Sequence, residues 1–335
     1  MEQIEYPSQS LWNTILARPT DSYDSLEPLV KEIFDEVATK GDKAVKQYSE
    51  QFDGVLIEDL QVPQKALDAA AEALSDELKK AMTQAKQNIE KFHRAQKTSK
   101  VELTTQAGVH CWQEKRPVEK VGLYIPGGSA PLFSTIMMLA IPAQIAGCQE
   151  RILCTPPNEK GDVDPAILYA AQLCGITTVY RVGGIQAIAA MTLGTASIPK
   201  VYKIFGPGNQ FVAEAKRILF GKVGIDLFAG PTEIAVIADD KADAEMVAVD
   251  LVGQAEHGYN SPAWLYTTSQ RVAEVVMKRV PELISDLPEV PRTNAEAAWR
   301  DYGEVILCDT DEEVATISDE YAPEHLEVQT EEIEW

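Results

Sequence analysis

Cysteine and histidine are both scarce in this sequence, with 5 and 4 copies among 335 residues. The cysteines are Cys111, Cys148, Cys154, Cys174 and Cys308. Their number is odd, and their spacing fits neither a zinc knuckle nor a disulfide framework. We therefore expect reduced thiols in a cytoplasmic protein, each serving as a small buried hydrophobic residue.

Long apolar runs and positive charge are also lacking. No stretch reaches about 18 uncharged apolar residues, so no transmembrane helix is expected. The N-terminus carries Glu2 and Glu5 and has no apolar segment, which argues against a signal peptide. Lys and Arg number 30 against 52 Asp and Glu, for a formal charge of −22. Because nucleic acids and anionic membranes attract basic proteins, neither is expected as a partner.

What is present indicates a globular protein of two or three domains, with 45% hydrophobic residues. Residues 1 to about 110 are predicted to be helical: apolar positions recur at helical spacing over 26–38, and an Ala-rich run follows Pro63. Ser75 can begin a further helix towards Lys97. This part holds no Gly-rich loop and no cluster of catalytic residue types, so we interpret it as a scaffold or a dimer-forming arm.

From about residue 118, strands alternate with helices. The first series predicts strands at 121–125, 151–155, 177–182 and 200–205, with helices at 131–146, 165–173, 186–191 and 211–219. The second predicts strands at 233–238, 263–267, 303–308 and 326–329, with helices at 240–255, 270–283 and 311–321. Such alternation is typical of parallel sheets with helices on both faces.

The predicted fold is therefore α/β, with two successive incomplete Rossmann-like parallel-sheet domains after an N-terminal helical segment. The expected division is a helical segment over 1–117, a first domain over 118–232 and a second over 233–335. The last residues, 330–335, look like the opening of another helix. Because a first helical turn gains few hydrogen bonds, we expect a truncated sequence rather than a natural end.

Three Gly-bearing turns follow predicted strands, at 124–128, 183–186 and 206–209, and a fourth at 229–233 precedes one. Ligands of parallel sheets bind at the carboxyl ends of strands, where glycine lets backbone N–H groups approach a phosphate. None of the turns is a complete G-x-G-x-x-G fingerprint, and a Walker A sequence is absent. Nucleotide loops and plain strand-to-helix turns both remain open.

Two pairs of residues are candidates for chemistry. Gln254 and His257 stand three apart at a predicted helix end and so share one face. They could contribute two zinc ligands, although further ligands would be needed, or His257 could bond the last helical carbonyls. Glu324 and His325 offer a carboxylate beside an imidazole, which suits stepwise proton transfer. The alternative is an incidental pair on a solvated loop.

Taken together, these segments resemble the histidinol dehydrogenase family. The resemblance covers most of the chain from about 118 to 330 in the family's order, and the N-terminal helices match more loosely. It is carried by six stretches: VGLYIPGG, RVGGIQAIAAMTLGT, KIFGPGNQFVAEAKR, GIDLFAGPTEIAVIAD, QAEHG and YAPEHLE.

The resemblance implies a zinc-containing, homodimeric enzyme that oxidises L-histidinol through the aldehyde to L-histidine with two NAD⁺, the last step of histidine biosynthesis. It assigns NAD contacts to Tyr124, Gln186 and Asn209. It assigns zinc and substrate contacts to Gln254 and His257, and a substrate contact to Thr232, where the family has Ser. Catalysis and substrate contacts fall to Glu324 and His325.

The resemblance also implies residues that this sequence does not contain. Family members continue further, and their remaining zinc ligands, an Asp and a His, lie in that tail with a substrate-binding Glu. The tail His serves the partner subunit of an intertwined dimer. A molecule of only these 335 residues is expected to bind zinc weakly and to turn over little. The alternatives are a paralogue that oxidises another small alcohol or diol, and a non-catalytic dimer-forming fragment.

Overall fold

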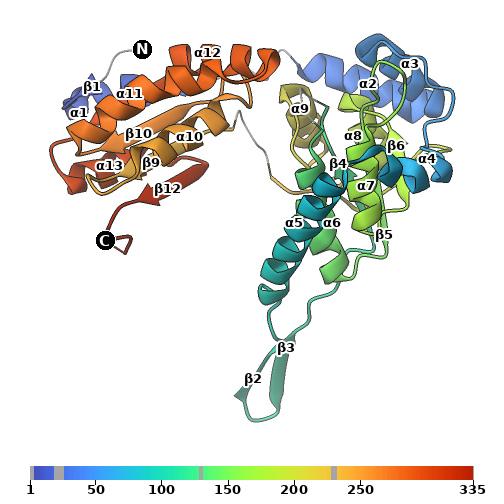
Figure 1. The fold of residues 1–335 in the computed structure, drawn as a ribbon. Coiled ribbons are helices and arrows are strands. Elements are labelled where there is room, and N and C mark those ends of the chain that lie inside the picture. The colour runs from blue at the N-terminus through green and yellow to red at the C-terminus, as the bar shows by residue number, and fades with distance from the viewer. Residues whose placement is uncertain (1–3, 19–25, 128–130, 228–231, 335) are drawn as a thin grey trace. The chain divides into compact units, whose positions relative to one another are not determined.

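The computed structural model describes residues 4–18, 26–127, 131–227 and 232–334 (Figure 1). Contacts divide the chain into two compact units. One unit consists of residues 23–229, and the other combines residues 1–22 with residues 230–335. Each unit has its own five-stranded sheet, in which all the strands are parallel.

The sheet of the 23–229 unit has the strand order β6-β5-β4-β7-β8. Its strands are β4 (Lys120–Tyr124), β5 (Glu150–Thr155), β6 (Thr178–Arg181), β7 (Lys203–Phe205) and β8 (Gly224–Ile225). The chain order reverses between β4 and β7, which are direct neighbours. The carboxyl ends of two such strands are where open parallel sheets hold ligands.

Helices cover both faces of this sheet, and the N-terminal helices take part on both. The elements are α2 (Glu27–Lys40), α3 (Asp42–Asp53), α4 (Gln64–Ala69), a 3₁₀ turn at Ala70–Ala73, α5 (Asp76–Ala95), α6 (Phe133–Ala146), α7 (Pro165–Leu173), α8 (Gly184–Leu193) and α9 (Gln210–Leu219). One core joins α2 and α3 to α8 and α9, and the other joins α4 and α5 to α6 and α7. The amphipathic helices α2 to α5 therefore bury their apolar stripes on this sheet.

One part of the N-terminal region differs from the helical prediction. Residues 101–113 form an antiparallel hairpin of β2 (Val101–Gln106) and β3 (Val109–Gln113). The physical reason is an apolar period of two, as in Val101 and Leu103, together with a turn at Gly108, whose φ is +83°. All residues of both strands are exposed, and the hairpin extends away from the sheet of its own unit (Figure 1).

The sheet of the other unit has the strand order β1-β11-β10-β9-β12. Its strands are β1 (Ile4–Glu5), β9 (Ile234–Ala238), β10 (Ala263–Thr267), β11 (Gly303–Leu307) and β12 (His325–Gln329). Its helices are α1 (Gln9–Ile15), α10 (Ala244–Ala255), α11 (Gln270–Ser285), α12 (Glu289–Tyr302) and α13 (Asp311–Tyr321). Helices α10, α11 and α12 form a core on one face, and α1 and α13 form a core on the other.

The predicted α/β class with two parallel sheets is confirmed, and most predicted elements lie within a few residues of their expected bounds. Helix α12 and strands β1 and β8 were not expected. Residues 330–334 form bends and a turn rather than the start of a helix. The limits of the two units differ from the three expected ranges, because the first helices pack on the first sheet while β1 and α1 join the second. Within the described residues, no helix combines the length and hydrophobicity that spanning a bilayer requires.

Candidate active site

In the 23–229 unit, the candidate residues gather at the carboxyl ends of β4, β6 and β7. Tyr124, the last residue of β4, is buried, and its hydroxyl accepts a hydrogen bond from the backbone N–H of Gly184 at 3.0 Å. Gly206 follows β7 and lies against the backbone of Tyr124, so that a Cβ on Gly206 would lie 2.0 Å from the Tyr124 carbonyl oxygen. Only glycine fits there, and its φ of +134° requires it too.

Gln186 lies next to the turn at Gly184, and Asn209 lies next to the turn at Gly206. Gln186 is fully buried on α8, and neither polar atom of its amide has a hydrogen-bond partner. A buried unpartnered amide is costly, and it points to a group that the protein normally binds there. Asn209 caps α9, since its Oδ1 accepts the N–H of Val212 at 3.2 Å, and its amide nitrogen stays available. Gly128 of the first turn lies outside the described residues.

A buried ion pair holds the turn after β7. The backbone N–H of Gly206 donates to Asp226 at 2.8 Å, and the carbonyl of Gly206 accepts from Nζ of Lys216 at 2.9 Å. Lys216 and Asp226 also form an ion pair with each other, and the side chain of Lys216 is 6% exposed. Both backbone groups of one glycine are therefore fixed by one pair of charges. Sequence reasoning did not single out either charged residue.

In the other unit, Gln254 and His257 lie at the end of α10. Gln254 is buried and its Nε2 has no partner, whereas His257 is exposed. Nδ1 of His257 lies 2.8 Å from the carbonyl oxygen of Gly253. That contact requires a proton on Nδ1, and in the neutral ring it leaves Nε2 with a free lone pair, the usual arrangement of a metal-binding imidazole. The bond to a late helical carbonyl, which the sequence offered as an alternative to zinc, thus coexists with an available ligand atom.

Glu324 and His325 lie where α13 passes into β12. Their side chains are 41% and 56% exposed, and Nε2 of His325 is 3.9 Å from Oε2 of Glu324. His325 is the first residue of β12 and pairs with Ile234, the first residue of β9. Thr232, which is half-buried, stands two residues before Ile234. The two loops that carry Thr232 and Glu324 therefore enter neighbouring strands at the same end of the sheet.

The side of β12 that carries His325 faces α10. Gln329, on the same side of the strand, donates to Asp250 of α10 at 2.8 Å. Burial and the nearby Asp250 raise the pKa of Glu327, which lies between Gln329 and His325 on that side. Helix α10 follows β9 and runs back along the sheet, so its last turn lies towards the amino ends of the strands. Gln254 and His257, at the end of that helix, are therefore expected towards the same end of the sheet as His325, which begins β12.

A further residue of this region is Glu233, between Thr232 and β9. Its side chain is 8% exposed and forms an ion pair with Arg18 at 2.8 Å. The hydroxyl of Tyr321 donates to it at 2.8 Å, and so does the N–H of Glu324 at 3.2 Å. Burial alone would raise the pKa of Glu233, but these donors outweigh burial and keep its pKa below the ordinary value. Sequence reasoning missed Glu233 and Arg18, because their partners lie far away in the chain.

The residues present fit part of a zinc site. Histidine nitrogen is a standard zinc ligand and an amide oxygen a rarer one, but zinc takes about four ligands. Among the residues that the structure describes, no group of three or more His, Cys, Asp or Glu side chains could hold a metal ion. Gln254 and His257 therefore make up at most half of a ligand set.

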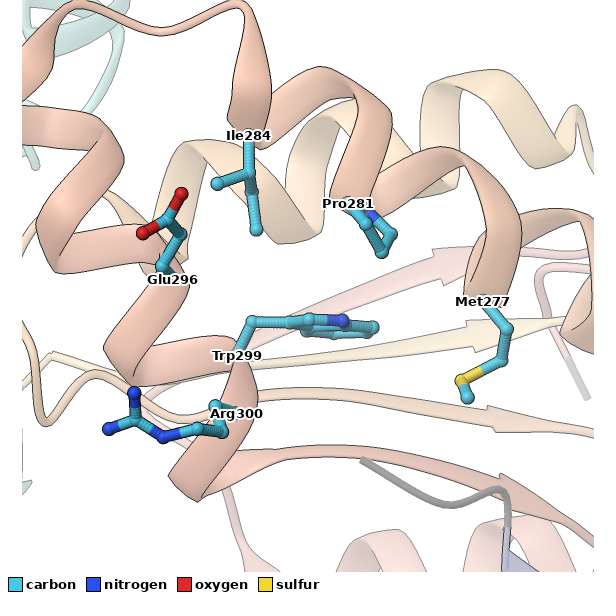
Figure 2. A pocket seen from close by; sticks show the side chains of 6 residues that line it. All are labelled: Met277, Pro281, Ile284, Glu296, Trp299 and Arg300. Carbon is cyan, nitrogen blue, oxygen red and sulfur yellow. The ribbon is translucent and has the colours of Figure 1, made fainter.

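Two cavities lie elsewhere in the same unit. One, of about 310 Å³, lies between α11 and α12 and is lined by Met277, Pro281, Ile284, Glu296, Trp299 and Arg300 (Figure 2). The other, of about 350 Å³, lies at the carboxyl end of the sheet beside Asp239, Thr268 and Asp311. Neither is lined by a candidate residue, so neither bears on the assignment of the site.

Comparison with known sequences gives a consistent set of relatives. The family model for histidinol dehydrogenase matches residues 16–335. A histidinol dehydrogenase homolog of Pelagibacter ubique is 56% identical over 85% of this chain and 67% of its own length. The histidinol dehydrogenase of Bacteroides thetaiotaomicron is 48% identical over 99% of this chain and 77% of its own. The sulfopropanediol 3-dehydrogenase of Ruegeria pomeroyi is 44% identical over 99% and 75%, respectively.

The fold agrees with these relatives. The crystal structure of histidinol dehydrogenase from Elizabethkingia anophelis superimposes with a TM-score of 0.95 at 45% identity, over 100% of this chain and 77% of that one. A family match over nearly the whole chain and a shared fold at this identity lead to the same assignment. The chain is an oxidoreductase that belongs to the histidinol dehydrogenase family.

Proposed function

We propose that this protein oxidises L-histidinol through the aldehyde to L-histidine in histidine biosynthesis, with NAD⁺ as the acceptor of both hydrides. The proposal rests on one observation. His257, whose ring is arranged as in metal-binding histidines, follows α10. The Glu324–His325 pair lies at the start of β12, whose His325 side faces α10. This arrangement supports a site in which a base, a carboxylate and a group that can hold an imidazole-bearing substrate act together.

The first oxidation needs a base beside the alcohol. A carbon releases hydride readily only when the attached oxygen gives up its proton, so proton and hydride leave the same C–OH group. His325 is suited to accept that proton, because neutral imidazole does so near neutral pH and its ring is more than half exposed. The product of this step is the aldehyde.

The second oxidation needs water. An aldehyde must first add water to form a hydrate, and loss of a hydride and a proton from the hydrate then gives the acid. Glu324 is suited to take the proton from the attacking water, since its carboxylate is exposed beside His325. Thr232, at the entry to β9, retains the hydroxyl expected of a substrate contact.

Tyr124, Gln186 and Asn209 are proposed to form the NAD site. The dinucleotide supplies a hydride acceptor when bound. The unpartnered amide of Gln186, the close approach of Gly206 to Tyr124 and the start of α9 fit a nucleotide that lies over the carboxyl ends of β4 and β7. Tyr124 itself is buried, so its contribution is to hold the turn at Gly184.

Gln254 and His257 are proposed to hold zinc together with ligands outside this pair. Bound zinc would hold the imidazole and amine of the substrate, which would favour an imidazole-bearing alcohol. Nε2 of His257 is the ligand atom that the structure leaves free. The amide of Gln254 is buried beside it on α10.

The protein is further proposed to act as a homodimer in the cytoplasm. The hairpin of β2 and β3 exposes Val101, Leu103, Val109 and Trp112, and Trp112 is 58% exposed. An apolar hairpin of this kind suits contact with a second copy. All five cysteines are free, as expected of a reducing compartment.

Product analysis tests the proposed reaction. The purified protein is incubated with zinc, NAD⁺ and a limiting amount of L-histidinol, and NADH and L-histidine are measured. The expected yield is two NADH and one L-histidine per L-histidinol consumed. One NADH with accumulation of the aldehyde would contradict the role of Glu324 in hydration. No NADH at saturating L-histidinol from a chain that also carries the family's C-terminal tail would reject the function.

A second candidate is oxidation of another small alcohol. It is favoured by the 44% identity to a sulfopropanediol dehydrogenase and by Thr232, at a position where the family resemblance implies Ser. Turnover of short diols in the same assay, at a higher kcat/KM than that of L-histidinol, would favour this candidate. A non-catalytic role would require the absence of turnover with both classes of alcohol.

A further inference from the structure

We infer that Arg18 and Glu233 are positioning residues that hold Glu324 and His325 in their working arrangement. The inference rests on the proposed function of that pair. Neither Arg18 nor Glu233 needs to touch the substrate. They act on the backbone of residues 321–324, the segment that connects α13 to β12.

Three backbone polar groups next to Pro323 are bound by these two residues. Nη2 of Arg18 donates to the carbonyls of Tyr321, at 2.6 Å, and Ala322, at 3.0 Å. Glu233 accepts the N–H of Glu324 at 3.2 Å. Proline has no N–H to offer, so these three bonds fix the backbone on both sides of it.

The backbone needs such support, because it turns sharply here. Ala322 has a φ of +48°, in the left-handed region that a residue with a Cβ seldom adopts. Strained positions of this kind persist when the surroundings hold them, and they concentrate at functional sites. The turn sends Glu324 and His325 out to solvent immediately after the buried Tyr321.

Glu233 and Arg18 are themselves held rigidly. Nε of Arg18 lies 3.0 Å from Oε2 of Glu233, and Nη2 lies 2.8 Å from Oε1, which is a bidentate pair. The guanidinium lies 4.3 Å from the ring centroid of Tyr321, whose other neighbour, Trp264, stacks at 3.8 Å. A buried carboxylate with this many donors has a single orientation.

Glu233 also joins two loops. It follows Thr232 directly, so one carboxylate sets the distance between the Thr232 loop and the Glu324 loop. Replacing residues that orient metal-binding side chains typically changes activity by about 10–100-fold, and we expect an effect of the same size for these positioning residues. The expected effect is on kcat, because the cofactor residues lie in the other unit.

The test compares Glu233→Gln and Arg18→Met with the wild-type protein. Each variant is expected to lower kcat by at least about tenfold and to change the KM for NAD⁺ by less than about twofold. Arg18→Lys keeps the charge but not the fork, and is expected to recover part of kcat. Tyr321→Phe removes one donor to Glu233 and keeps the stacked ring. It should lower kcat by roughly threefold to tenfold in a protein that still folds.

Arg217→Met is the matched control. Arg217 forms a bidentate pair with Glu214. The side chain of Arg217 is 47% exposed and that of Glu214 is 0% exposed. Both residues lie in the 23–229 unit. These exposures resemble the 41% and 8% of Arg18 and Glu233. Unchanged kcat in folded Glu233→Gln and Arg18→Met would overturn the inference, and so would an equal loss of kcat in Arg217→Met.

Hydrogen exchange separates this inference from the proposed function. The backbone amide of Glu324 is expected to exchange faster in Glu233→Gln than in the wild type or in Arg217→Met, without any substrate. If a chain that also carries the family's C-terminal tail makes no NADH from L-histidinol, the proposed function fails while this result still supports the positioning role. Equal exchange of that amide in all three proteins would overturn the positioning role even if the enzyme is active.

Discussion

The hydroxyl of Tyr124 accepts the backbone N–H of Gly184 at 3.0 Å, so the last residue of β4 holds the turn that begins α8. The two residues are 60 positions apart in the chain. The N–H of Gly184 would otherwise be an unsatisfied donor at the start of a helix. Tyr124, which the family resemblance assigns to NAD contact, thus also stabilises this turn through its hydroxyl. Phe has a ring of the same size but lacks this hydroxyl.

Replacing Tyr124 by Phe is expected to raise the KM for NAD⁺ by roughly fivefold and to leave kcat nearly unchanged, because the Gly184 N–H loses its acceptor and the turn loosens. Steady-state kinetics at varied NAD⁺ measure this effect. Tyr180→Phe is the matched control. The Tyr180 hydroxyl donates a hydrogen bond of 2.8 Å to the carbonyl of Ser197, which is not part of the Gly184 turn. An unchanged KM in Tyr124→Phe would show that the bond does not shape the cofactor site.

Replacing Asp226 by Asn is expected to destabilise the protein by about 3 kcal/mol, because Lys216 would remain buried without its counter-charge. Thermal unfolding measures the loss, and saturating NAD⁺ should restore part of it by binding the folded state. Asp162→Asn is the control, since that carboxylate is 71% exposed and 3.8 Å from Arg181. Equal melting temperatures for the two variants would contradict the importance of the buried pair.

His325→Gln and Glu324→Gln are expected to separate the two oxidations. His325→Gln should slow the alcohol step by about 10²–10⁴-fold, the usual contribution of a general base. Glu324→Gln should slow the aldehyde step more than the alcohol step, so that the aldehyde accumulates. Rapid-quench analysis with L-histidinol and with the aldehyde as substrates measures each step. Identical losses in both steps for both variants would refute the division of roles.

His257→Asn is expected to lower the amount of bound zinc, because Nε2 of His257 is free to act as a ligand and an amide binds zinc poorly. Atomic emission after dialysis against buffered zinc measures the metal directly, without any assay of activity. His110→Asn is the control, since His110 lies on the exposed hairpin. Equal zinc content in the two variants would remove His257 from the ligand set.

Asp53 gives a prediction on pH. Burial raises its pKa from 3.8 to about 6, and its Oδ2 has no partner. As the pH rises, the unfolded chain loses this proton first, so stability falls between about pH 4 and pH 6 and the penalty is complete above that range. The melting temperature of Asp53→Asn minus that of the wild type should therefore be larger at pH 8 than at pH 4. A difference in melting temperature that does not change with pH would contradict the raised pKa.

Local patterns were sufficient for the elements of both sheets. Buried parallel strands such as β5 and β10 are short apolar runs, and the helices after them carry clear starts, such as Asp164 before Pro165. The helical prediction was wrong for residues 101–113. Their apolar residues recur with a period of two, as in a strand, but they follow a long region rich in helix-forming residues. They also missed α12, whose buried side is made largely of small residues, with Trp299 as the exception.

Individual residues of the candidate site could be predicted only where they lie in a stretch that matches the family. The rule that ligands bind at the carboxyl ends of parallel strands suits Tyr124 and Gly206. It does not suit His325 and Thr232, which lie at the amino ends of β12 and β9. Which end a loop occupies depends on how α10 returns along the sheet, and sequence spacing does not contain that information.

The order of apolar runs, glycine turns and helix caps was enough, without coordinates, to determine that this chain forms two parallel α/β sheets and to mark its candidate residues. These features act over a few neighbouring residues, so the linear sequence contains them. The tertiary structure alone decided that Arg18 reaches Glu233, 215 positions away, and that Lys216 and Asp226 meet at Gly206. Such pairings depend on how strands are ordered in a sheet, and strand order is set by the packing of the whole unit.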